Sequence, residues 1–228
     1  MAVATALTEA IARLDVRFGA RTVVTAATAA DRMRERRFLT ETAFDRLTGG
    51  IEAGSVVALV GQGTCGKVTL ALRAVAGAQR EGAMALWIDG ARSFDAVAAH
   101  RAGIDLRRLV VVRARTGAEV LLASGAGLRS EGFRLVVVDL GPSFAQAASP
   151  DSLSSILPHA RGSTSALLVI ADAPPMRLAM PTFEFERVAW ERQHGRITGW
   201  TYAVRHRRET SAWSRIEDPR ARARGSTA

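Results

Sequence analysis

Five apolar runs recur along the chain, and segments with helical spacing separate them. The runs are SVVALV (55–60), MALWI (84–88), LVVV (109–112), LVVV (135–138) and ALLVI (166–170). Apolar residues are continuous within each run, which is typical of strands that helices cover on both faces of a parallel sheet. We therefore predict an α/β fold with a core of mostly parallel strands and helices on both faces.

The N-terminal segment has a different pattern from this core. Residues 5–18 place apolar side chains at helical spacing, and Gly19 follows them as a stop. The charged stretch DRMRERR (31–37) has little to bury and is typical of a linker. We predict a small helix and strand appendage in residues 1–37, with a boundary to the main domain near Arg37.

The C-terminal part alternates instead of running continuously. The segments FEFERVAWER (183–192) and ITGWTYAVRH (197–206) alternate apolar and polar residues on either side of a turn. This pattern predicts an antiparallel hairpin at one edge of the sheet. The core then spans 38–216, and residues 217–228 are expected to form a basic, disordered tail.

Composition narrows the class of protein. With 228 residues, of which 48% are hydrophobic, the chain can bury one sizeable core. It has neither an apolar run of membrane-spanning length nor a signal-peptide pattern, so we expect a cytoplasmic protein without a membrane partner. A single cysteine, Cys65, fits a reducing compartment. The net charge of +9 suggests a polyanionic partner such as nucleic acid, although a coding bias toward arginine gives the same excess.

The stretch ALVGQGTCGKVTLAL (58–72) carries the clearest chemistry. It holds the only lysine of the chain, Lys67, in a Gly-x-x-x-x-Gly-Lys pattern that follows a buried strand and opens a helix. Backbone N–H groups of such a loop point at phosphate oxygens, and lysine adds a compact charge that arginine replaces poorly. We predict a nucleotide cradle, for which a plain glycine turn with a solvated lysine is the alternative. Its residues are Gly61, Gly63, Thr64, Cys65, Gly66, Lys67, Val68 and Thr69.

The sequence lacks one of the ligands that would hold Mg²⁺ beside this cradle. The residue after the lysine is Val68, where a serine or threonine hydroxyl would bind Mg²⁺. Thr69 comes one residue late and points about 100° away on the helix. Asp139, which ends the run LVVVD, is the candidate carboxylate for holding Mg²⁺ through water, with capping of the next loop as the alternative.

These motifs resemble the bacterial RecA recombinase over roughly residues 5–206. The segments LDVRFGARTVV, GQGTCGKVTLALRAVAGAQREGAMALWIDGARSFD, GIDLRRLVVVRARTG and LVVVDL carry the resemblance. Within that superfamily the chain is most similar to the shorter ImuA proteins, which act in DNA-damage-induced mutagenesis and are related to a SulA-like group. The resemblance implies a RecA-like core, ATP as a weakly bound cofactor and little use of Mg²⁺.

Several RecA positions carry other residues here. The water-activating glutamate falls at Ala91, and the aspartate at Asp89 accompanies that glutamate in RecA rather than replacing it. Asp95 matches an adenine-contacting aspartate, whereas the stacking tyrosine falls at Ala98. The second residue of the Asn-Gln pair that senses the γ-phosphate falls at Asp172, where a carboxylate is expected to repel phosphate.

The resemblance also implies partner-binding residues. RecA subunits dock on one another through a segment that corresponds here to LDVRFGARTVV. Its candidate contact residues are Leu14, Phe18, Gly19, Val23 and Val24.

A second set of partner contacts lies near the C-terminus. Arg205 and Arg207 fall where RecA has two lysines that reach the neighbouring subunit's nucleotide, so they are possible trans fingers. The alternative is an exposed edge strand with alternating charges.

Direct contact with DNA is expected to be weak. The counterparts of the two DNA-binding loops of RecA are residues 141–152 and 172–182. Arg177 is their only basic residue, and Phe144 is their only aromatic residue for stacking on nucleotide bases. Three arginines of the tail would give weak, salt-sensitive binding to single-stranded DNA: Arg220, Arg222 and Arg224.

Together these features predict a degenerate RecA-like protein with weak or absent ATPase activity. It would act through contacts with RecA or with itself, for example by limiting a RecA filament. The family role implies a Y-family polymerase homologue and an error-prone polymerase as further partners in the SOS response. An active DNA-dependent ATPase or recombinase, and a cell-division inhibitor of the SulA type, remain the alternatives.

Overall fold

A computed structural model describes most of the main domain and a few residues before it. The described residues are 9–10, 12–14, 16–17, 37–130, 132–141, 154–161, 163–174, 180–206 and the backbone of 210–217. Contacts divide the chain into two compact units, Met1–Arg37 and Phe38–Ala228.

In the first unit the described residues between 9 and 17 are helical, as their spacing predicts. Leu14 is 40% exposed there. The other predicted docking residues, Phe18, Gly19, Val23 and Val24, lie outside the described residues.

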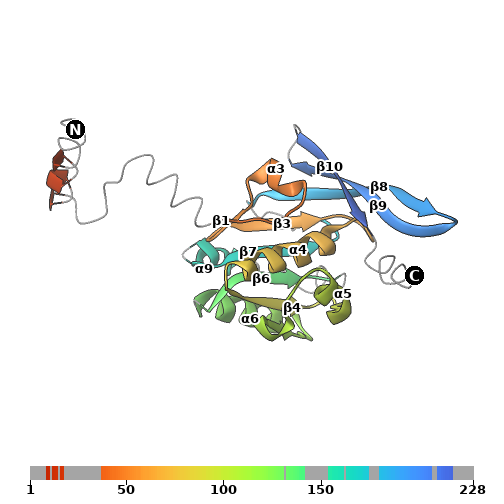
Figure 1. Cartoon of the computed structure of the whole chain (residues 1–228). Coiled ribbons are helices and arrows are strands. Elements are labelled where there is room, and N and C mark those ends of the chain that lie inside the picture. The colour runs from red at the N-terminus through yellow and green to blue at the C-terminus, as the bar shows by residue number, and fades with distance from the viewer. Residues whose placement is uncertain are drawn as a thin grey trace. The chain divides into compact units, whose positions relative to one another are not determined.

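A mostly parallel sheet forms the centre of the second unit (Figure 1). Within the described part of the chain, one sheet has eight strands in the order β10-β9-β8-β3-β7-β6-β4-β5. The predicted apolar runs are its parallel members, which confirms the α/β, RecA-like expectation. Their bounds are β3 (Val56–Val60), β4 (Met84–Asp89), β5 (Leu109–Val112), β6 (Phe133–Asp139) and β7 (Ala166–Ala171).

The predicted C-terminal hairpin is also present. Strand β8 (Thr182–Gln193) runs parallel to β3 and antiparallel to β9 (Arg196–His206). A further antiparallel strand, β10 (Thr210–Glu217), pairs with β9, so the hairpin becomes a three-stranded edge. The alternating pattern did not predict β10.

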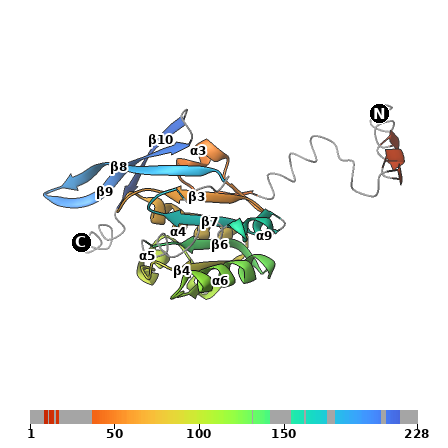
Figure 2. The ribbon, with the colours of Figure 1, turned by 180° about the vertical axis from the view of Figure 1, so that it is seen from behind.

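Helices cover both faces of the sheet, as Figures 1 and 2 show from opposite sides. Helix α4 (Lys67–Arg80) packs on one face, and α6 (Gly117–Arg129) packs on the other with α9 (Leu157–Arg161). Neighbouring residues of β6 therefore face different cores: Val137 points to the α4 side and Val136 to the α6 side.

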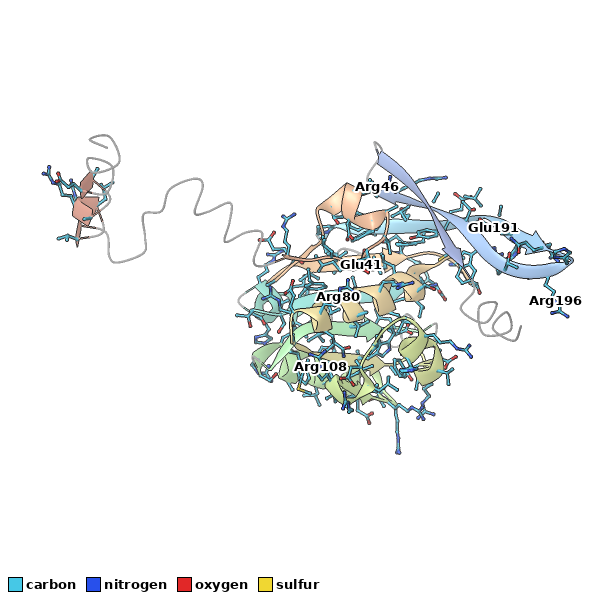
Figure 3. The ribbon with its side chains drawn as sticks, viewed as in Figure 1. Glu41, Arg46, Arg80, Arg108, Glu191 and Arg196 are labelled. Carbon is cyan, nitrogen blue, oxygen red and sulfur yellow. The ribbon has the colours of Figure 1, made fainter. Side chains whose placement is uncertain are left out.

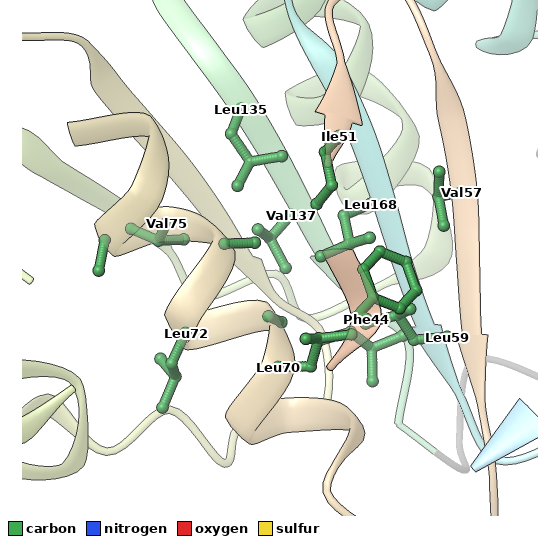
Figure 4. Close-up of a cluster of buried hydrophobic side chains, with 14 of the residues drawn as sticks. Phe44, Ile51, Val57, Leu59, Leu70, Leu72, Val75, Leu135, Val137 and Leu168 are labelled. Atoms are coloured by element: carbon green, nitrogen blue, oxygen red, sulfur yellow. The ribbon is translucent and has the colours of Figure 1, made fainter. Parts of the chain in front are cut away.

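The larger core lies between α4 and the sheet (Figure 4). Leu70 and Val75 of α4 lie against Leu135 and Val137 of β6. Because both partners are fully buried, this packing fixes the position of α4, and with it the loop that precedes the helix.

Short elements complete the second unit. Strand β1 (Arg37–Phe38) pairs with β2 (Ile51–Glu52), and α3 (Phe44–Thr48) lies between them in the sequence. Helix α5 (Ala96–Arg101) and the 3-10 helix η1 (Leu106–Arg108) precede β5. Arg80, labelled in Figure 3, ends α4 with an ion pair to Glu41 at 3.3 Å. Among the helices of the described residues, none combines the length and the apolar character that crossing a membrane requires.

Candidate nucleotide-binding site

The glycine-rich loop connects the buried strand β3 to the N-terminus of α4. Gly63 and Gly66 adopt φ angles of 57° and 100°, which favour glycine. Gly61 is needed for space, because a Cβ atom there would meet the Phe185 carbonyl oxygen and would lie 2.7 Å from the Cys65 sulfur. No side chain caps the helix at Gly66, and its first turn carries no acidic residue. The local geometry is compatible with the phosphate cradle that the sequence predicts.

Lys67 begins α4 and turns back over this loop. Its ammonium nitrogen lies 2.5 Å from the Gly61 carbonyl oxygen and 3.3 Å from that of Gly63. It also lies 3.0 Å from a carboxylate oxygen of Asp172, which follows β7. Lys67 is only 7% exposed, so it is buried and not solvated, and the binding of nucleotide at this loop stays a prediction.

Two further hydrogen bonds join the loop to the end of β7. The Gly61 backbone N–H donates to the Ala171 carbonyl oxygen at 3.2 Å, and the side-chain amide of Gln62 donates to the Asp172 carbonyl oxygen at 3.1 Å. The sequence predicts that Asp172 repels phosphate. The structure shows in addition that the Asp172 carboxylate forms an ion pair with Lys67. Because these residues are 105 apart in the chain, no local signal predicted the pair.

A second group of carboxylates lies at the ends of β4 and β6. Asp139 accepts a hydrogen bond from the Ser93 hydroxyl at 3.3 Å. Burial is the main reason that its pKa rises to about 6, and nearby Asp89 and Asp172 add to the rise, whereas Ser93 and Lys67 oppose it. Asp89 accepts from the backbone N–H groups of Ser93 and Phe94 at 2.9 and 3.3 Å, so it supports the loop after β4.

The positions of the metal ligand and the catalytic base carry apolar side chains. Val68 is 38% exposed on the first turn of α4, and Thr69 beside it is half-buried. Ala91 is half-buried. A Cβ atom added at Gly141 would lie 2.6 Å from the Cα atom of Ala91. The backbone therefore packs closely where RecA has its glutamate.

The site fits phosphate better than it fits Mg²⁺. The glycine loop and Lys67 offer N–H groups and a positive charge, which polyphosphate requires. A magnesium ion requires several oxygen ligands, and Val68 offers none. Within the described residues, no three His, Cys, Asp or Glu side chains form a group that could hold a metal ion.

Asp95 and Ala98 lie at the start of α5. The Asp95 carboxylate accepts from the N–H groups of Val97 and Ala98 at 2.8 and 3.1 Å, so it caps the helix. This role was readable from an aspartate directly before a helical run. The adenine contact that the resemblance implies stays a prediction.

A cavity of about 430 Å³ lies beside the loop, between the end of β7 and the strands β8 and β9. Its polar lining includes Gln62, Asp172, Glu184, Arg187 and Arg205. Arg187, which sequence reasoning missed, donates to the Thr64 carbonyl oxygen at 2.9 Å and so joins β8 to the loop.

The two possible trans fingers differ in what the structure describes. Arg205 pairs with Glu186 at 2.6 Å across the hairpin, and both side chains are exposed. Because β10 pairs with β9, Arg205 does not lie on an edge strand as the alternative assumed. Arg207 lies outside the described residues, as do Arg177, Phe144 and the tail arginines.

A parallel sheet whose glycine-rich loop opens a helix at a buried lysine defines the class of P-loop nucleotide-binding folds. Residues 5–152 match the RecA N-terminal domain, and the chain belongs to that family.

Individual relatives match a shorter part of the chain. It is 35% identical over 91 residues to the protein RecA of Chloroherpeton thalassium, and that stretch covers 40% of this chain and 26% of the relative. Over alignments of the same length and coverage it is 38% identical to RecA of Acidothermus cellulolyticus and 40% to RecA of Roseiflexus sp.. The chain thus matches about a quarter of the length of these curated relatives.

Proposed function

We propose that this chain is a RecA-like accessory protein of the DNA-damage response that binds nucleotide weakly and acts through protein contacts. The closest role is that of ImuA proteins in SOS mutagenesis. There the chain would contact RecA or a second copy of itself, and would connect a Y-family polymerase homologue with an error-prone polymerase during translesion synthesis. Limiting the growth of a RecA filament is the simplest mechanical consequence.

One observation carries this proposal: the two buried carboxylates that end β4 and β6 already have partners within the protein. Asp89 accepts from Ser93 and Phe94, and Asp139 accepts from Ser93. A general base for ATP hydrolysis must be free to orient water near the γ-phosphate. Losing a single preorganised group of this kind costs about 3 kcal/mol of barrier, or roughly a hundredfold in rate.

The exposed N-terminal helix supports the partner side of the proposal. Leu14 is 40% exposed and Val16 is 90% exposed, although both are apolar. Matching of the RecA N-terminal domain begins at residue 5, so the family resemblance includes this segment. Apolar residues left exposed at one segment are typical of a docking surface.

Hydrolysis separates this proposal from an active ATPase. Phosphate release is measured with Mg²⁺, with and without single-stranded DNA, for the wild type and Lys67→Ala. We expect both proteins to release phosphate at the same background rate. Robust turnover that needs Mg²⁺ and disappears in Lys67→Ala would overturn the proposal.

Capture of purified RecA tests the docking segment. Phe18→Ala and Val23→Asp are compared with Leu122→Asp, which changes an apolar residue of α6 that is 73% exposed and lies outside the segment. We expect the first two variants to capture less RecA than the wild type and Leu122→Asp to capture as much. Equal capture by all four proteins would exclude this segment as the interface.

A further inference from the structure

We propose that Asp172 is an internal ligand of Lys67 and competes with the phosphate groups of a nucleotide for the P-loop. The inference rests on the proposed function, because it assumes that the loop still receives a nucleotide. It adds a built-in competitor to that site, which lowers affinity until the carboxylate moves away.

The hydrogen bonds of Lys67 are the first argument. An ammonium group has three N–H donors, and Lys67 has three acceptors at 2.5, 3.0 and 3.3 Å. Two are backbone carbonyl oxygens of the loop itself, from Gly61 and Gly63. The third is the Asp172 carboxylate, so a phosphate oxygen gains a full hydrogen bond from Lys67 only after one of these acceptors releases it, and Asp172 is the acceptor that lies outside the loop.

Asp172 is also the partner that can leave. Its side chain is 40% exposed, whereas that of Lys67 is 8% exposed. An ion pair with one solvated partner is weak, because water competes for the carboxylate. A polyphosphate carries more negative charge than one carboxylate, so it can displace Asp172 from Lys67.

The backbone holds Asp172 in place while its side chain stays free to turn. The backbone carbonyl oxygen of Asp172 accepts from the side-chain amide of Gln62, and that of Ala171 accepts from the Gly61 backbone N–H. Rotation of the Asp172 side chain breaks neither bond. The neighbouring cavity of about 430 Å³ gives the displaced carboxylate space, and Arg187 and Arg205 line it together with Glu184 and Glu186.

Nucleotide binding tests this competition. A fluorescent ATP analogue is titrated without Mg²⁺ into the wild type, Asp172→Asn and Glu186→Gln. The Glu186→Gln control removes the same charge from the same cavity, but Glu186 pairs with Arg205 rather than with Lys67. We expect Asp172→Asn to tighten binding about tenfold, through the freed lysine and the lost repulsion, and Glu186→Gln to change it by less than about twofold.

Several outcomes would overturn the inference. Unchanged or weaker binding by Asp172→Asn would do so, as would an equal gain in Glu186→Gln or the absence of binding in all three proteins. A double-mutant cycle adds a further requirement: in the Lys67→Ala background, Asp172→Asn must give a clearly smaller gain than in the wild type. Equal gains in both backgrounds would show that Asp172 acts on phosphate without Lys67.

A second measurement does not need nucleotide. Lys67 is the only lysine, so peptide mass spectrometry after reaction with an amine-selective reagent separates the label on this side chain from that on the N-terminal α-amino group. We expect Asp172→Asn to be labelled several times faster at Lys67 than the wild type and Glu186→Gln, because its ammonium has lost one acceptor. Equal labelling of all three proteins would show that the pair does not form.

The two proposals fail in different ways. Mg²⁺-dependent phosphate release by the wild type would end the proposed function while leaving the labelling result as it is. Equal labelling and equal affinity would end the Asp172 inference while phosphate release stayed at background.

Discussion

Asp89 and Asp139 end neighbouring parallel strands as register partners, and both are buried. Their Cα atoms pair at the carboxyl ends of β4 and β6, where the two residues are 1% and 6% exposed. Two carboxylates placed so close in a buried site oppose each other's ionisation. The site therefore holds negative charge at a cost to the folded state, and this cost depends on pH.

The pKa of Asp139 predicts the direction of that dependence. Its pKa rises from 3.8 to about 6 on folding, so the folded protein holds the proton more tightly than the unfolded chain. Stability from this group is full below about pH 4 and is lost as the pH rises through about 6. We expect the wild type to lose about 3 kcal/mol from this source between pH 4 and pH 8, about half of it above pH 5, and Asp139→Asn to avoid that loss.

Urea unfolding between about pH 5 and pH 8 measures the effect. Asp105→Asn is the control, because hydrogen bonds from Arg107 lower the pKa of Asp105 and move its titration below this range. Its slope should equal that of the wild type. An Asp139→Asn variant with the wild-type slope would mean that another group causes the dependence.

Two glycines of the loop are required for different reasons: Gly61 because there is no space for a side chain, and Gly63 because of its backbone conformation. A methyl group at Gly61 would meet the Phe185 backbone and the Cys65 sulfur, whereas one at Gly63 meets nothing within 4 Å but requires a φ angle of 57°. We expect Gly61→Ala to lower the free energy of unfolding by more than about 2 kcal/mol, and Gly63→Ala by about 1 kcal/mol. Urea unfolding of both variants measures the difference, and equal losses would contradict the close contact between the loop and β8.

The sequence predicted those parts of the fold and site that local patterns determine. The run at 135–138 is apolar at every position because neighbouring residues face different cores, and that alone indicates a doubly covered strand. The loop around Lys67 was predictable because glycine spacing, strand and helix lie within a few residues.

Contacts between distant segments could not be predicted in this way. The Lys67–Asp172 pair depends on β3 and β7 being neighbours, and the contact of Arg187 with Thr64 depends on β8 lying beside β3. Both require the strand order, which a single sequence does not contain. The segment 210–217 was missed as a strand for the same reason, because it is defined by pairing with β9.

Trp87 tests the larger core, in which it is 1% exposed on β4. Its ring lies 5.3 Å from that of Phe94, in the segment that also supports Asp89. We expect Trp87→Ala to cost about 3 to 5 kcal/mol, because it leaves a large cavity. Trp190→Ala is the control, since Trp190 is 38% exposed and should cost about 1 kcal/mol. Thermal unfolding that ranked the two losses in the opposite order would contradict the assigned burial.

Variants of Arg205 test whether this residue stabilises the hairpin or contacts a partner. Arg205 and Glu186 have side chains that are 58% and 63% exposed, so their ion pair is solvated. A double-mutant cycle with Arg205→Ala and Glu186→Ala should give a coupling energy below about 0.5 kcal/mol in urea unfolding. Loss of RecA capture by Arg205→Ala at unchanged stability would then favour the trans-finger interpretation. If capture by Arg205→Ala and Glu186→Ala both equal that of the wild type, the alternating charges only keep the exposed strand solvated, because neither residue would then contribute to folding or to the partner.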